Sequence, residues 1–140
     1  MATFTSQIFE ILSLNGDNVG SSVTNTINNV NYVDNRILSV PSESVTTLFS
    51  MDSVPGAGTF VTSSVKYVRV TNNSNTAPVK LIISSSTEAM SYLISTGSSY
   101  LLSTSKMTGS TSGLSFDDIK SVKVQPSGSA ASIEYYIVTT

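Results

Sequence analysis

The sequence has no His, no Cys and no Trp, whereas Ser and Thr together make up about a third of it. Imidazole and thiol groups supply the usual general base near neutral pH, the low-pKa nucleophile and the nitrogen and sulfur ligands of metals. Without them, catalysis would have to depend on carboxylates, Lys or Tyr. The composition therefore favours a structural or binding protein that is not an enzyme and uses neither a metal nor a cofactor.

Charge is also scarce, because only 11% of the residues are charged, against about 25% in an average soluble domain. Seven basic and nine acidic residues give a net charge of −2, with no basic stripe of the kind that nucleic-acid binding requires. The exposed surface must consist largely of Ser, Thr and Asn, which cost less to desolvate at an interface than Lys or Glu. This composition fits a surface covered by another subunit and, equally well, the hydroxyl-rich exterior of an environmental β protein.

A chain of 140 residues is typical of one domain and can bury a core without disulfides or metals. Residues 1–7 contain neither the basic start nor the apolar run of a signal peptide. No later segment has the apolar length of a membrane span. We expect a soluble protein that is not exported by a signal peptide and does not enter a membrane.

The strongest periodicity in the sequence is that of β-strands. Residues 65–71 alternate, with Tyr67 on the face opposite the valines, and residues 77–84 repeat the pattern. A cluster of turn-forming residues lies between them, at 72–76. The two segments are predicted to form a hairpin with a loop of about five residues.

The second half of the chain continues this rhythm. A turn signal at residues 95–98 separates apolar segments at 90–94 and 99–102, which predicts a second hairpin. A turn at 126–129 precedes the last predicted strand, residues 133–138. Such regularly spaced turns are typical of sandwiches and jelly rolls. We expect an all-β fold, a single antiparallel β-sandwich or jelly-roll domain with a partly extended N-terminal segment.

The N-terminal third is less regular. Residues 8–14 fit either a buried strand or a short helix, and the Asn15–Asn18 turn that follows them favours the strand. Residues 19–35 are rich in Asn, Ser and Thr, and they look extended and weakly committed to a core. The predicted organisation is an N-terminal strand and extended arm, residues 1–35, and a β-sandwich domain, residues 36–140, within one structural domain.

Few residues are candidates for chemistry. Asp117 and Asp118 are adjacent carboxylates, but sequence neighbours point apart, and the spacing from Ser115 to Asp118 predicts a capping box at a short helical turn. The loop before it, residues 106–113, is expected to be mobile. The Asn15–Asn18 segment offers oxygen atoms but lacks the carboxylates of a calcium loop.

Two Ser-x-x-Lys matches, Ser63 to Lys66 and Ser103 to Lys106, have the spacing of some serine acyl enzymes. The Ser-Asp-Asn and Lys-Thr-Gly elements that accompany this spacing are missing. We therefore predict no catalytic, cofactor-binding or metal-binding residue in this chain.

Apolar residues of the arm, and aromatic residues whose strand phase turns them outward, are the candidates for contacts with another subunit. Tyr67 faces away from the neighbouring valines, and one of the adjacent Tyr135 and Tyr136 must face outward. Tyr offers a large contact area at an interface. Residues 1–14 and 19–35 are predicted to contact neighbouring subunits. The individual interface residues predicted are Phe4, Ile8, Phe9, Ile27, Val30, Tyr32, Tyr67 and Tyr136.

The pattern of residues 66–72, 79–83, 119–124 and 133–138 resembles small β-sandwich virion proteins of tailed bacteriophages, particularly those that infect marine bacteria. The resemblance is one of pattern and composition over the last half of the chain, and it carries over no functional residue. It implies a late structural gene product that self-assembles on a capsid or tail, often as a trimer or as a layer of copies. The N-terminal arm would then reach a neighbouring subunit and become ordered on assembly.

These expectations indicate a virion structural protein, most specifically a capsid decoration or cement protein that stabilises the particle through subunit contacts. Its partners would be the major capsid protein or other virion proteins and further copies of itself, with a trimer favoured, and neither nucleic acid nor a membrane. The main alternative is a tail-fibre or spike module that recognises host surface glycan through loops 72–76 and 103–113. A subunit of a bacterial surface layer is a weaker third hypothesis, because an export signal is not found.

Overall fold

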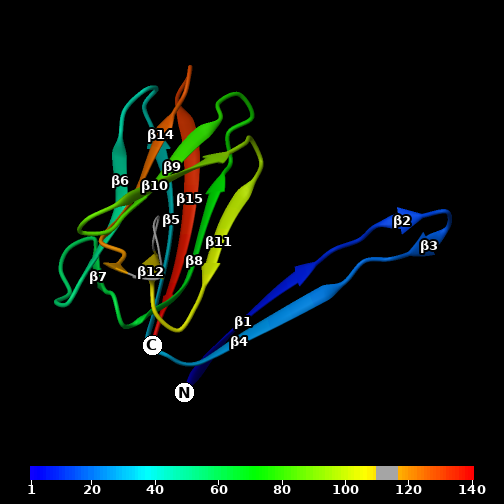
Figure 1. The fold of residues 1–140 in the computed structure, drawn as a ribbon, viewed down its shortest axis with the longest axis horizontal. Helices are drawn as coiled ribbons and strands as arrows, with labels where there is room; N and C mark the ends of the chain where they lie inside the picture. The colour runs from blue at the N-terminus through cyan, green and yellow to red at the C-terminus, as the bar shows by residue number, and fades with distance from the viewer. Residues whose placement is uncertain (110–116) are drawn as a thin grey trace.

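Two β-sheets pack face to face, and a long β-hairpin leaves one end of this sandwich (Figure 1). The computed structural model describes residues 1–109 and 117–140. These residues form strands and contain no helix. The predicted all-β class is therefore confirmed.

The first sheet has five strands in the order β10-β9-β14-β6-β7. Their bounds are β6 (Thr46–Asp52), β7 (Thr59–Val61), β9 (Val79–Ser84), β10 (Ala89–Ile94) and β14 (Ser121–Pro126). Adjacent strands are antiparallel except β6 and β7, which are parallel. This sheet is called the five-stranded sheet below.

The second sheet has four antiparallel strands in the order β11-β8-β15-β5. Their bounds are β5 (Tyr32–Val40), β8 (Val65–Asn72), β11 (Ser99–Ser103) and β15 (Ala131–Thr139). A short pair, β12 (Thr108–Gly109) and β13 (Asp117–Asp118), stands apart from both sheets. The hairpin, called the arm below, comprises β1 (Ala2–Phe9), β2 (Ser13–Leu14), β3 (Asp17–Asn18) and β4 (Ser22–Val30).

The core lies between the two sheets and follows from alternation along the strands. Val68 of β8 and Ile137 of β15 belong to one buried cluster with Leu81 of β9. Across the sandwich, the ring of Phe49 in β6 lies 5.5 Å from that of Tyr135 in β15, centroid to centroid. Each sheet therefore buries one face against the other, and its second face is available for the arm or for solvent.

The two predicted hairpins, 65–84 and 90–102, do not form, although all four of the strands predicted for them exist. β8 lies in the four-stranded sheet and pairs with β11 and β15, whereas β9 lies in the five-stranded sheet and pairs with β10 and β14. β10 and β11 are separated in the same way. The turns at 72–76 and 95–98 are therefore crossings between sheets. Alternation predicts a strand with one buried face, and it does not distinguish a return within one sheet from a crossing to the facing sheet.

Asn72 holds both of these crossings at one corner. Its side chain is completely buried, and its Nδ2 donates hydrogen bonds to the carbonyl oxygens of Ala77 at 2.8 Å and Ile94 at 3.2 Å. Its Oδ1 accepts a hydrogen bond from the amide of Ser74 at 3.0 Å. One amide group therefore joins the end of β8, the segment before β9 and the end of β10.

The predicted helical turn is wrong where it can be compared with the structure. Asp117–Asp118 forms β13 and pairs with Thr108–Gly109. Ser115 and Phe116, the first residues of the predicted capping box, lie outside the described residues. Short polar residues at the spacing of a capping box also occur beside strands. The spacing alone therefore does not distinguish a helical turn from a strand.

The first residues of the predicted mobile loop, 106–109, pack against the sandwich. Met107 is completely buried, and Nζ of Lys106 lies 2.8 Å from Oδ1 of Asp118. Residues 110–113 of the predicted loop lie outside the described residues. Met107 is the one large apolar side chain in this hydroxyl-rich segment, and its burial explains why residues 106–109 lie against the sandwich.

We predict that Asn72→Ala lowers the free energy of unfolding by about 3 kcal/mol, because it leaves buried carbonyl groups without a donor. Urea unfolding measures this change. Asn75→Ala, in the same loop but exposed, is the matched control and is expected to cost less than about 0.5 kcal/mol. Equal destabilisation by the two variants would contradict the role of Asn72.

Candidate functional site

The arm is a single hairpin, although its strands are interrupted. β1 pairs with β4 and β2 pairs with β3 in one continuous register. Between these pairs, the N–H of Glu10 donates to the carbonyl oxygen of Ser21 at 2.8 Å, and the N–H of Val19 donates to that of Leu12 at 2.9 Å. At the rise of a β-strand, the arm extends over about 35 Å from residue 4 to its turn.

Two glycines shape the arm. Asn15 and Gly16 form its two-residue turn with φ values of 52° and 92°, the left-handed conformation that a type I′ turn requires. Gly20 lies where the two strands approach closely, because a Cβ atom there would lie 1.8 Å from the carbonyl oxygen of Glu10. The predicted turn after residues 8–14 is confirmed, and these residues are extended and not helical.

The two faces of the arm differ in character. Side chains alternate along each strand, and the register then places on one face Phe4, Ile8, Leu12, Leu14, Val19, Val23 and Ile27. This surface is called the apolar face of the arm. The opposite face carries Thr5, Gln7, Thr24 and Thr26 near the sandwich and, farther out, the exposed side chains of Phe9 and Ile11.

The apolar face of the arm is covered only at its root. Phe4 and Ile27, close to the sandwich, are half-buried. Farther out, the exposed fractions lie between 45% and 59% for Ile8, Leu12, Leu14, Val19 and Val23. The polar pair Glu10 and Ser21 lies between Ile8 with Val23 and Leu12 with Val19. Several exposed apolar side chains on one face of a monomer mark an interaction site.

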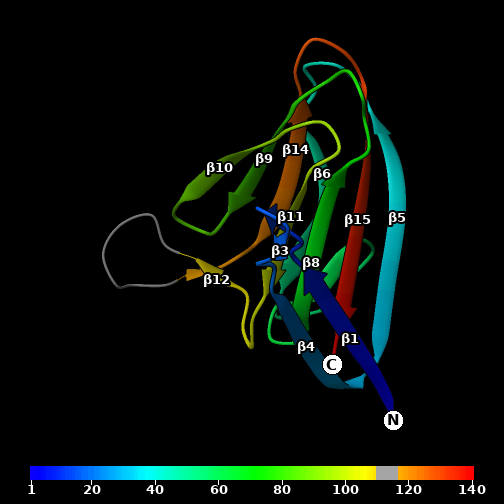
Figure 2. The same ribbon diagram turned by 90° about the vertical axis from the view of Figure 1, so that its right-hand side faces the viewer.

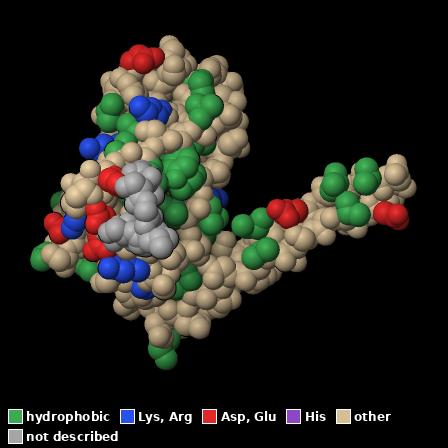
Figure 3. Space-filling model, in the orientation of Figure 1, with side chains coloured by type: hydrophobic (Ala, Val, Ile, Leu, Met, Phe, Trp, Pro, Cys, Tyr) green, Lys and Arg blue, Asp and Glu red, His purple; other side chains and the backbone are tan. Residues whose placement is uncertain are grey.

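Charge on the arm is exclusively acidic. Residues 1–30 contain Glu10 and Asp17 but neither Lys nor Arg, and alternation places both carboxylates on the apolar face of the arm. In Figure 3 the protruding part of the arm shows green and red side chains and no blue one, whereas blue side chains lie on the sandwich. The arm therefore presents an apolar surface with negative charge.

Phe4 anchors the arm on the outer face of the four-stranded sheet. Its ring lies 4.8 Å from that of Tyr67 and 5.7 Å from that of Tyr136, centroid to centroid. Tyr67 is only 5% exposed, although its side chain points away from the core. The guanidinium of Arg69 lies 5.9 Å from the centroid of Tyr136. The arm thus completes an aromatic cluster outside the sandwich.

Polar contacts hold the root as well. The hydroxyl of Ser6 in β1 donates to that of Tyr67 at 3.5 Å, and Nδ2 of Asn25 in β4 donates to Oγ of Ser103 in β11. The N–H of Asn31 donates to the carbonyl oxygen of Thr139 at 3.0 Å, next to the C-terminus. Beyond these contacts the arm diverges from the four-stranded sheet (Figures 1 and 2).

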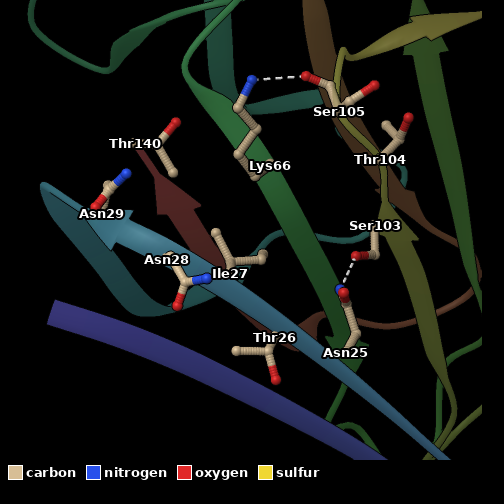
Figure 4. A pocket seen from close by; sticks show the side chains of 10 residues that line it. All are labelled: Asn25, Thr26, Ile27, Asn28, Asn29, Lys66, Ser103, Thr104, Ser105 and Thr140. Atoms are coloured by element: carbon tan, nitrogen blue, oxygen red, sulfur yellow. Dashed lines mark hydrogen bonds between the residues drawn. The ribbon is translucent and has the colours of Figure 1, made fainter.

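A cleft of about 410 Å³ lies at the root of the arm (Figure 4). Its walls come from β4, from β8 and from the segment after β11, and they consist of Asn25, Thr26, Ile27, Asn28, Asn29, Lys66, Ser103, Thr104, Ser105 and Thr140. Nζ of Lys66 donates to the carbonyl oxygens of Ser63 at 2.5 Å and Ser105 at 2.6 Å. The cleft therefore offers hydroxyl and amide groups, which suit a neutral hydrogen-bonding ligand.

A second pocket, of about 360 Å³, lies where β5 and β7 meet at one edge of the sandwich. Asp34 in its wall is almost buried, and it accepts hydrogen bonds from the hydroxyl of Tyr135 at 3.1 Å and from Nε of Arg36 at 3.0 Å. Burial, and then the negative charge of Asp34, raise the pKa of Tyr135 to about 12. The hydrogen bond to Asp34 raises the pKa of Arg36 above its ordinary value.

Three of the predicted interface residues lie together, but within one chain. Phe4, Tyr67 and Tyr136 form the aromatic cluster at the root of the arm. Alternation predicted that Tyr67 faces outward and that one of Tyr135 and Tyr136 does so. Their contact joins residues more than sixty positions apart in the sequence, and alternation contains no signal for it.

The other predicted interface residues are dispersed. Ile8 and Phe9 are exposed on opposite faces of the arm, Ile27 lines the cleft, and Val30 is half-buried at the end of β4. Tyr32 lines the second pocket and is the first residue of β5. The sandwich strands therefore begin within the segment that was expected to belong to the arm.

The outer part of the apolar face of the arm lies within the predicted contact segments 1–14 and 19–35, but its residues Leu12, Leu14, Val19 and Val23 were not among the individual residues predicted. A signal for it exists, because the two-residue Asn-Gly turn sets the register of both strands. Counting outward from that turn places these four residues on one face.

The lysines of the two Ser-x-x-Lys matches make contacts with groups other than a serine hydroxyl. Lys66 binds the backbone carbonyl of Ser63, and Lys106 pairs with Asp118. Two loops were predicted to bind glycan. The first, 72–76, contains Asn72, which holds the crossings between the sheets. In the second, residues 103–105 line the cleft. Residues 110–113 lie outside the part of the chain that the structure describes.

Comparisons with known proteins assign no family, because the chain has no significant match to a protein-family model, to a curated protein or to a solved structure. Over residues 1–109 and 117–140, no three His, Cys, Asp or Glu side chains gather as metal ligands, and no helix is long and apolar enough to cross a membrane. The resemblance to phage virion proteins stays a prediction. Functional conclusions depend on the residues of this chain.

We predict that Phe4→Ala releases the arm from the sandwich, because it removes two aromatic contacts worth about 0.5 to 1.5 kcal/mol each. Amide hydrogen exchange is expected to become faster in β1 and β4 and to stay unchanged in β5 and β15. Phe9→Ala is the matched control, since it removes a ring that is 67% exposed on the opposite face of the same strand. Identical exchange in the two variants would show that Phe4 does not hold the arm.

A second prediction concerns alkaline stability. The pKa of Tyr135 in the folded protein, about 12, lies above its ordinary value of 10.0, so the folded state favours the neutral phenol. This contribution to stability is fully present below pH 10 and is lost as the pH rises through about 12. We expect the free energy of unfolding, measured with urea, to fall over this range.

The fall should be smaller in Tyr135→Phe. Tyr32→Phe, which changes an exposed tyrosine of the same pocket, should behave like the unaltered protein. Burial also raises the pKa of Tyr100 to about 12, which accounts for a remaining decrease in both variants. Parallel curves for Tyr135→Phe and the unaltered protein would contradict the assignment.

Proposed function

We propose that this chain is a non-enzymatic virion structural protein, most specifically a capsid decoration or cement protein that binds neighbouring subunits through its arm. The observation that carries the proposal is the row of exposed apolar side chains on an arm that is anchored only at its root. A two-stranded ribbon is marginally stable alone in water. Contact with another subunit would bury its apolar face and stabilise it.

The energetic gain from such a contact is substantial. Burying an exposed Val, Leu or Ile side chain stabilises a complex by about 1.5 to 3 kcal/mol at most. Several such residues lie on the apolar face of the arm, and the surrounding Ser, Thr and Asn cost less to desolvate than Lys or Glu. These terms favour a protein that works in an assembly.

The virion is the site that the sequence resemblance favours for this assembly. The low charge and the lack of Cys suit a protein that is made in a host cytoplasm and is then exposed to an external medium. Its partners are, on this proposal, the major capsid protein or other virion proteins, and further copies of the chain, with a trimer favoured.

A second candidate function is a tail-fibre or spike module that recognises host surface glycan. The cleft at the root of the arm supports it, because its Asn, Ser and Thr side chains are the groups that bind sugar hydroxyls, and Ser103 to Ser105 belong to a loop predicted for this role. Glycan-array binding that disappears in Lys66→Ala and Thr104→Ala would favour this candidate over a decoration protein.

The proposal predicts that Leu12→Ser with Val19→Ser leaves a folded protein that joins particles at least about tenfold less, because burial of these side chains drives assembly. Quantitative mass spectrometry of purified particles, relative to the major capsid protein, measures incorporation. Thr5→Ala with Thr24→Ala, on the opposite face of the arm, is the matched control and should be incorporated normally. Normal incorporation of the Leu12 and Val19 variant would contradict assembly through the arm.

A further inference from the structure

We infer that the apolar face of the arm binds the outer face of the five-stranded sheet of a second copy of this chain. The inference rests on the proposed function, because it takes the arm as the element of assembly and identifies the surface that receives it.

Over residues 1–109 and 117–140, the outer face of the five-stranded sheet carries positive charge that no carboxylate neutralises. Lys80 of β9 pairs in register with Gln125 of β14, and Ile82 of β9 pairs with Lys123 of β14. The two lysines are therefore diagonal neighbours, with Cβ atoms about 7 to 8 Å apart. Among the residues that the structure describes, no carboxylate pairs with either lysine.

The other cations of the sandwich are already bound. Carboxylates pair with Arg36, Arg69, Lys106 and Lys120, and two backbone carbonyl oxygens bind Lys66. On the outer face of the four-stranded sheet Glu134 pairs with Arg69, and the arm of the same chain covers part of this face. Of the two outer faces, that of the five-stranded sheet therefore fits an acidic partner better.

Apolar side chains lie beside the two lysines. Leu93 of β10 is 72% exposed and pairs in register with Lys80. Half-buried Ile82 lies between Ser91 and Lys123 in the next row. The surface formed by Lys80, Ile82, Leu93 and Lys123 is called the lysine face. It combines apolar area with positive charge.

The apolar face of the arm is the complement of the lysine face. It carries Glu10 and Asp17 among its exposed apolar side chains, and residues 1–30 contain neither Lys nor Arg. Glu10 accepts a hydrogen bond only from a hydroxyl, that of Ser21 at 2.8 Å, among the contacts described.

The contact must join two copies. The arm leaves from the four-stranded sheet, on the opposite side of the sandwich from the lysine face (Figures 1 and 2). It therefore cannot cover the lysine face of its own chain. Such a contact joins two different surfaces, so it closes into a ring where the rotation between copies permits and otherwise continues as a layer.

Sedimentation analysis of the full-length chain tests the inference through single charge reversals. Lys80→Glu is expected to raise the dissociation constant for self-association by about tenfold, because it sets like charges against each other. Lys106→Glu, which changes the net charge by the same amount away from the lysine face, should leave the constant unchanged. Raised salt should weaken the association of the unaltered chain.

Reversal of both partners supplies the decisive measurement. Lys80→Glu with Lys123→Glu, and separately Glu10→Lys with Asp17→Lys, should each abolish self-association, whereas an equal mixture of the two variants should associate again. Circular dichroism checks that both variants keep the β-sheet signal. Recovery on mixing supports the inference, because each variant then offers the other an opposite charge.

Three results would overturn it: a monomeric unaltered chain, association that is insensitive to Lys80→Glu, or no recovery on mixing. In each of these cases the proposed function is judged separately, by the incorporation of Leu12→Ser with Val19→Ser into particles. Loss of incorporation without self-association would leave the arm as an assembly element whose partner is another virion protein.

Discussion

A sheet of a β-sandwich buries one face in the core, and its other face stays in solvent unless a further element covers it. In this protein the four-stranded sheet places Tyr67 and Tyr136 on that second face, and Phe4 of the arm covers them. The position of the arm depends on this contact. Because the anchor lies near the N-terminal end of β1, the rest of the ribbon extends away from the sandwich with its apolar face uncovered.

Alternation of residues predicted the strands well and their connections poorly. The segments at 65–71 and 77–84 are strands, as expected, but they belong to different sheets. The difference depends on Asn72, whose side chain is buried at the crossing and binds carbonyl groups on both sides of it. In the sequence, Asn72 is one of several turn-forming residues in a row, and only the tertiary structure shows which of them is buried.

The candidate site was predicted in part, for a related reason. The outward direction of Tyr67 follows from local strand phase, whereas its cover by Phe4 depends on a contact between distant segments. The outer apolar residues of the arm, such as Leu12 and Val19, lie within the predicted contact segments 1–14 and 19–35, but they were not singled out because residues 8–14 fit both a helix and a strand. The two-residue Asn15-Gly16 turn sets the register of the arm, so counting outward from it groups these residues on one face.

The scarcity of charge gives the remaining charged residues more influence on assembly. Apolar burial along the arm supplies affinity with little orientation, because the hydrophobic effect is not directional. Charged groups supply orientation and discrimination between partners. In this chain the acidic residues of the arm and the two lysines of the five-stranded sheet, which pair with no carboxylate of the described residues, lie on surfaces that one molecule cannot bring together. A surface of hydroxyl and amide groups surrounds both, so few other charges compete with them in selecting how copies meet.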